Sequence, residues 1–170
     1  MNSDPGPTVL FHTRTGGLSR AGLVRFARRL RRDIGGGRDF CALITGDAEL
    51  QRMNGEFRGK HYPTDVLSFP SPDDTSLGEI AISMDRAREQ GREFGHSVAT
   101  ELSVLMLHGV LHLTGLDHER DNGEMQRKEL YWRRKFGLPA GLIERVSGEG
   151  SASNKGKRRG QTRSGRQASQ

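Results

Sequence analysis

The chain has 170 residues and a single cysteine, and its 27 basic and 21 acidic side chains give a formal net charge of +6. This length indicates one domain with a sizeable core, while a single cysteine excludes a disulfide framework and is consistent with a reducing compartment. The polar N-terminus does not resemble a secretory signal, and no apolar run approaches the roughly 20 residues that cross a bilayer, so we expect a cytoplasmic protein without a membrane partner.

The N-terminal part is expected to form a strand, a helix and a second strand, over residues 8–12, from Ser19 onward, and over residues 40–45. Ser19 is placed to cap the helix, which should end at three consecutive glycines. Its apolar side chains recur at helical spacing and are Leu23, Phe26, Ala27, Leu30 and Ile34. The opposite face is either a solvated surface or an RNA-facing patch, because it carries Arg25, Arg28, Arg29, Arg31 and Arg32.

The central part is expected to alternate short helices and strands. Asp47 is placed to cap a helix over residues 47–54, and a polar loop over residues 57–64 leads to a strand over residues 66–69. A further strand is expected over residues 77–83, with Ile80 and Ile82 on one face. Ser83 can then cap a helix that runs to about Phe94.

The C-terminal part is predicted to be helical. Ser97 begins a long helix, Asp121 and Glu124 have capping-box spacing for another that ends at Gly137, and residues 140–146 are expected to form a short terminal helix. With strands in the middle and helices on either side, the pattern predicts an α+β fold, a single domain with one sheet packed against helices.

The positive charge is concentrated at the C-terminus. Residues 147–170 carry six basic side chains and one acidic side chain, or +5, which leaves about +1 for residues 1–146. We therefore predict a folded domain over residues 1–146 and a disordered basic tail over residues 147–170, which has no apolar side chain larger than alanine. Such tails commonly bind polyanions, and the alternative is a solubilising tail with no fixed partner.

Three of the six histidines lie within eleven residues, at His108, His112 and His118. The first two are four residues apart and therefore share one face of the long helix. Gly115 can end that helix in a left-handed conformation and return His118 to the same point. Three converging imidazoles predict a site for one divalent transition metal ion, most plausibly Zn²⁺, with a fourth position open for catalysis.

The motif departs from that of the helical zinc proteases at one position. Their H-E-x-x-H pattern supplies a glutamate as general base, whereas this chain has Gly109 there. Without that carboxylate, peptide hydrolysis would lose about 10²–10⁴-fold in rate. Cleavage of a phosphodiester, with its anionic transition state, can rely more on a metal and a nearby cation.

Arg58 is the candidate for that cation. It precedes Gly59 in the polar loop expected before a buried strand, and its planar guanidinium suits a phosphate group. The alternative is a surface ion pair with Glu56 or another acidic neighbour.

These segments together resemble the YbeY family of bacterial endoribonucleases. The resemblance spans roughly residues 40–136 and is carried by Asn54, Phe57-Arg58-Gly59, residues 63–70, residues 77–80 and residues 108–118. It implies a small mixed β-sheet flanked by helices, with the metal in a cleft. It also implies that His108, His112 and His118 are the zinc ligands and that Arg58 is the functionally important arginine. It also implies single-stranded RNA as substrate, including the 3′ end of 16S rRNA, a role in ribosome quality control, and the small ribosomal subunit and its proteins as partners.

Two other functions remain open at this stage. A non-catalytic ribosome assembly factor would use zinc only to brace the fold, and metal removal would then unfold the protein. A metzincin-like zinc peptidase would need a replacement for the missing base. For the nuclease, the nucleophile is either the 2′-hydroxyl of the RNA or a water molecule activated by the metal.

Overall fold

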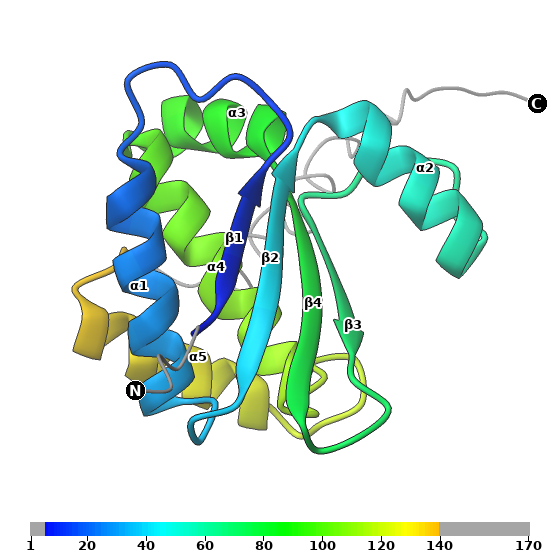
Figure 1. Ribbon diagram of the computed structural model, residues 1–170, viewed down its shortest axis with the longest axis vertical. Helices are drawn as coiled ribbons and strands as arrows, with labels where there is room; N and C mark the ends of the chain where they lie inside the picture. The colour runs from blue at the N-terminus through cyan, green and yellow to red at the C-terminus, as the bar shows by residue number, and fades with distance from the viewer. Residues whose placement is uncertain (1–5, 140–170) are drawn as a thin grey trace, which may run out of the picture.

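The computed structural model describes residues 6–139 and shows a four-stranded mixed sheet with five helices around it (Figure 1). The strands are β1 (Thr8–Phe11), β2 (Asp39–Thr45), β3 (Val66–Pro70) and β4 (Ser76–Ser83). The helices are α1 (Arg20–Asp33), α2 (Asp47–Arg58), α3 (Met84–Phe94), α4 (Val98–Leu113) and α5 (Glu124–Phe136). The strand order is β1-β2-β4-β3, with β3 antiparallel to β4 and the other pairs parallel. The predicted α+β class and mixed sheet are confirmed.

The alternation of side chains along β4 divides the core into two parts. Ile80 and Ile82 belong to the main core, which α1, α3 and α4 close over one face of the sheet. Ala81 points the other way and packs with Leu50 of α2 and Leu67 of β3 in a smaller cluster. The period of two in a strand therefore places α2 and α4 on opposite sides of β3 and β4.

Helix α4 is the central element of the main core. Eleven of its sixteen residues are buried, including His108 near its C-terminal end. A helix that is apolar on almost all sides is stable only when other elements surround it. The sheet, α1, α3 and α5 do so here, and α4 therefore presents its histidines from a rigid support.

The predicted serine caps are confirmed. Ser19, Ser83 and Ser97 precede α1, α3 and α4, and their side chains accept hydrogen bonds from the backbone N–H groups of Gly22, Arg86 and Thr100. Each cap satisfies one of the N–H groups left unpaired in the first turn of a helix.

The prediction for α2 was wrong at both ends. Gly46, not Asp47, is the N-cap residue, and the Asp47 carboxylate instead accepts a 2.5 Å hydrogen bond from Ser83 Oγ. The helix also continues to Arg58, so Arg58 lies in its last turn and not in a loop. The loop after α2 returns over Gly55, where a Cβ atom would lie 2.9 Å from His61 Nδ1. A Cβ atom at position 55 would therefore require the exposed His61 side chain to shift.

The start of α5 differs from the predicted capping box. The helix begins at Glu124 after Gly123, which has a φ of 81°. Asp121 lies before the helix, and its carboxylate accepts hydrogen bonds from the N–H groups of Gly123, Glu124 and Met125. The predicted end at Gly137 is confirmed.

The expected terminal helix over residues 140–146 and the predicted basic tail lie outside the described residues. Within residues 6–139, no helix combines the length and the apolar character needed to span a membrane.

Candidate metal centre and cleft

The structure brings His108, His112 and His118 together, and one nitrogen from each lies within 4.8 Å of the other two. His108 and His112 come from the last two turns of α4, and their Nε2 atoms are 3.1 Å apart. Gly115, with a φ of 93°, then turns the chain so that His118 approaches from the following segment. Gly115 is needed here because side chains other than glycine rarely adopt this backbone conformation. The three imidazoles could hold a metal ion.

Two of the histidines are oriented by hydrogen bonds at the other ring nitrogen. His108 Nδ1 is 2.9 Å from Glu129 Oε2, and His112 Nδ1 is 2.9 Å from the carbonyl oxygen of Leu116. An acceptor at each Nδ1 keeps the proton there, which leaves the Nε2 lone pair free to bind a metal. The donor set and its orientation therefore fit a transition metal ion.

Glu129 is the site residue that the sequence did not reveal. It lies on α5, is 1% exposed, and accepts through its second oxygen a 2.8 Å hydrogen bond from Nε of Arg133. Arg133 is 2% exposed and also donates to the carbonyl oxygen of Pro139. The available signal was the Glu-to-Arg spacing of four residues, but this spacing is also common on solvated helices.

Burial and the two neighbouring imidazoles lower the pKa of His112 from 6.5 to about 4. Desolvation is the largest cause, because it disfavours the charged ring. His112 is therefore neutral at physiological pH, which is the form that binds a metal.

Without metal, this shift should make folding stability depend on pH. The unfolded chain takes up the proton near pH 6.5, whereas the folded protein resists it until about pH 4. The free energy of unfolding should therefore be highest above pH 6.5 and fall between these two values. Urea denaturation of the metal-free protein across this range would measure the slope. In His112→Asn the slope should be smaller, and an unchanged slope would show that another group causes it.

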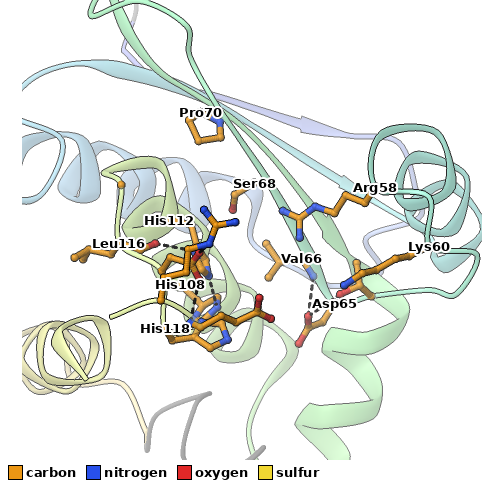
Figure 2. A pocket seen from close by; sticks show the side chains of 15 residues that line it. Arg58, Lys60, Asp65, Val66, Ser68, Pro70, His108, His112, Leu116 and His118 are labelled. Carbon is orange, nitrogen blue, oxygen red and sulfur yellow. Dashed lines mark hydrogen bonds and ion pairs between the residues drawn. The ribbon is translucent and has the colours of Figure 1, made fainter. Parts of the chain in front are cut away.

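The histidines line a cleft of about 530 Å³ between the C-terminal end of α4 and the edge strand β3 (Figure 2). Val66, Ser68 and Pro70 line it from β3, because alternate residues of a strand face the same side. Three cationic side chains also line the cleft, and they are Arg58, Lys60 and Arg120.

Arg58 extends from the end of α2 toward the histidines, on the opposite side of the cleft (Figure 2). Gly59 ends α2 with a φ of 65°. Asn54 donates to the carbonyl oxygen of Tyr62 at 2.8 Å and so holds the following loop against the helix. The alternative ion pair with Glu56 is absent in the described residues, where Glu56 binds Arg52 instead. The structure therefore places Arg58 across the cleft from the candidate metal centre.

His61 and His96 lie outside the cleft, whereas the acidic residues Asp65, Asp117 and Glu119 line it. His61 lines a separate hollow along α2, and His96 is 3.3 Å from Glu101. Asp117 accepts a hydrogen bond from the backbone of Glu119, which stabilises the turn before α5. Asp65 lines the cleft, and its Oδ1 accepts a hydrogen bond from the N–H of Val66.

The absence of a glutamate at position 109 has a structural reason. Gly109 faces the sheet, and a Cβ atom there would lie 3.1 Å from Ile80 Cγ2 and 3.2 Å from Val66 Cγ2. A carboxylate built on this position would point into apolar side chains.

We therefore expect Gly109→Glu to gain no peptidase activity and to lose about 3 kcal/mol or more of stability, through overpacking and a buried charge. Urea denaturation and a casein cleavage assay measure the two effects. Gly109→Ala is the matched control, with a loss of about 2 kcal/mol at most, since the better helix propensity of alanine offsets part of the overpacking. A stable Gly109→Glu protein that cleaves casein would contradict this account.

Comparisons with a family model and with individual proteins point to the same family. The family described as "Endoribonuclease YbeY" matches residues 31–136. Proteins named "Endoribonuclease YbeY" from Solibacter usitatus and Koribacter versatilis are 56% and 44% identical to this chain, over 86% and 89% of its length and 99% of theirs. The solution structure of TM1509 from Thermotoga maritima superposes with a TM-score of 0.54, at 27% identity over 89% of this chain and all of that one. The matched segment carries all three clustered histidines and Arg58, and this chain belongs to the YbeY family.

Proposed function

We propose that this protein is a zinc-dependent endoribonuclease that cleaves single-stranded RNA. The observation that supports this most directly is the meeting, in one cleft, of three imidazoles that fit a metal and the guanidinium of Arg58. The family adds weight, because its relatives carry the name endoribonuclease. His108, His112 and His118 are the proposed ligands.

Zinc is the proposed metal, because three neutral imidazoles with an open fourth position are typical of catalytic zinc. When bound, the ion would supply Lewis acidity toward a phosphate oxygen and lower the pKa of a water molecule. Glu129 and the carbonyl oxygen of Leu116 would hold two of the ligating rings in the correct orientation.

The cationic side chains would position the RNA and offset its charge. Arg58 can form two parallel hydrogen bonds to one phosphate and so stabilise the charge that develops on it. Lys60 and Arg120 line the same cleft and would bind neighbouring phosphates. The nucleophile is either the 2′-hydroxyl of the substrate or water, and a substrate with one 2′-deoxy nucleotide at the cleavage site distinguishes them.

The proposed substrate is small-subunit ribosomal RNA, including the 3′ end of 16S rRNA, with a further role in ribosome quality control. This part rests on the family resemblance and implies the small subunit and its proteins as partners in the cytoplasm. The zinc-braced assembly factor is the alternative. The zinc peptidase is disfavoured, since position 109 faces the sheet and not the cleft.

Cleavage of single-stranded RNA by Arg58 variants tests the proposal. Arg58→Ala should lower kcat by about 10²–10³-fold, and Arg58→Lys should recover only part of it, since lysine lacks the bidentate geometry. Arg92→Ala is the control, because Arg92 is also exposed but lies on α3 and does not line the cleft. Equal cleavage by all four proteins would reject Arg58 as a catalytic residue and favour the assembly factor.

A further inference from the structure

Positive charge is concentrated on two helices that do not form the cleft. Helix α1 carries six arginines and one aspartate, and α5 carries five basic and two acidic side chains, so together they contribute +8. Residues 1–146 have a net charge of only +1, so the remainder of that segment nets −7. Such segregation is unlike an evenly solvated surface and is typical of a site for a polyanion.

An aromatic ladder joins the two helices. Phe26 of α1 meets Phe136 of α5 with ring centroids 5.4 Å apart, Phe136 stacks on Trp132 at 5.5 Å, and Trp132 meets Tyr131 at 5.1 Å. Two cations lie on this ladder, Arg29 over Phe136 at 4.7 Å and Lys135 over Tyr131 at 5.5 Å. Tyr131 ends the ladder and is 52% exposed, so about half of this residue is accessible to a ligand.

Three of the five basic side chains of α5 are available for binding, whereas Lys128 pairs with Glu124 and Arg133 with Glu129. None of Arg127, Arg134 and Lys135 forms an ion pair with another residue of the described range 6–139. With Tyr131 they line a hollow of about 520 Å³, and Arg25 and Arg29 line a second hollow with Phe136. We call these six residues the α1–α5 face, and they are Arg25, Arg29, Arg127, Tyr131, Arg134 and Lys135.

The face begins beside the cleft. The segment that contributes Gly115 to Arg120 to the cleft leads directly into α5, and Arg127 Nη1 donates to the carbonyl oxygen of Asn122 in that segment. At 1.5 Å per residue, Lys135 lies about 17 Å along the helix from its first residue. An RNA strand that leaves the cleft at Arg120 can therefore follow α5 from Arg127 to Lys135.

We propose that the α1–α5 face is a second binding surface for single-stranded RNA, which holds the part of the substrate that extends beyond the cleft. Phosphates bind the arginines and Lys135, and an unpaired base stacks on Tyr131. This inference rests on the proposed function, because it assigns the surface to the RNA that the cleft cleaves. It makes long RNA a better ligand than RNA that only fills the cleft.

The test compares the affinities of a short RNA of about six nucleotides and a long RNA of about 24 nucleotides by fluorescence anisotropy, with RNA integrity checked on a gel. The double variant Arg134→Ala/Lys135→Ala should bind the long RNA with about tenfold lower affinity. It should also reduce the slope of log affinity against log salt by about 1.4, for two lost phosphate contacts. The short RNA should bind and be cleaved as in the wild type.

The matched control is Arg14→Ala/Arg92→Ala, which removes the same charge from exposed positions outside the face. Tyr131→Ala should lower the affinity for the long RNA about tenfold. Tyr131→Phe should keep the wild-type affinity, because it keeps the aromatic ring. An equal loss of affinity for the long RNA in the two double variants would overturn the proposal. It would show that the basic side chains act only through general electrostatic attraction. Failure of the wild type to cleave any RNA would instead contradict the proposed function, while the binding comparison still decides on the surface.

Discussion

Replacing His112 with alanine is expected to abolish metal binding and to lower RNA cleavage by about 10³-fold or more, while the fold persists. His112 is one of the three proposed ligands, and its Nε2 atom is 3.1 Å from that of His108, one turn away on α4. Two imidazoles cannot reproduce a three-ligand site, and the metal contributes several kcal/mol to stabilising a phosphoryl transition state. Metal content, RNA cleavage and circular dichroism measure the three parts of the prediction.

The matched control is His61→Ala, since His61 is exposed and lines a hollow on α2, apart from the cleft. It should cleave RNA and bind metal as the wild type does. Equal activity of His112→Ala and the wild type would show that the histidine cluster is not the catalytic centre.

Removal of the metal distinguishes between the two proposed functions, the nuclease and the zinc-braced assembly factor. Helix α4 carries two of the histidines and is held in place by the main hydrophobic core, which does not depend on a metal. A chelator should therefore remove RNA cleavage and leave most of the helical circular dichroism signal. Cooperative unfolding on chelation would instead indicate a metal that braces the fold.

Replacing Glu129 with alanine is expected to be the most destabilising single change at the site, at about 3–5 kcal/mol. The substitution leaves the Arg133 guanidinium, 2% exposed, without the carboxylate that accompanies it. It also removes the acceptor at His108 Nδ1, so the metal affinity should fall about 10–100-fold. Urea denaturation and competition with a metal chelator measure the two losses separately.

A second variant separates the two roles of Glu129. Glu129→Leu/Arg133→Leu removes both buried charges together and should recover most of the stability, since apolar residues of similar size can replace a buried pair. Its metal affinity should stay low, because His108 Nδ1 still lacks its acceptor. Wild-type metal affinity in this double variant would show that Glu129 acts only on stability.

Features that depend on local spacing were predicted from the sequence. Ser19, Ser83 and Ser97 each cap an N–H group three residues away, and His108 and His112 share a helix face because of its 3.6-residue period. The period of two along β4 likewise placed Ile80 and Ile82 on one face of the sheet. The convergence of the three histidines followed from these patterns and from the position of Gly115, whereas the mixed sheet was expected from the family resemblance.

Only the tertiary structure decided which distant groups meet at the site. His108 and Glu129 are 21 residues apart, and their contact depends on how α5 packs against α4. The contact of His61 with Gly55 depends on how the loop after α2 returns to the helix, and the close fit at Gly109 depends on Ile80 and Val66 across the interface. Helical periods and caps act within one or two turns, so the sequence determined the elements and the metal-binding pattern. Packing between elements is not encoded at any fixed spacing, so it alone oriented Arg58 and supplied Glu129.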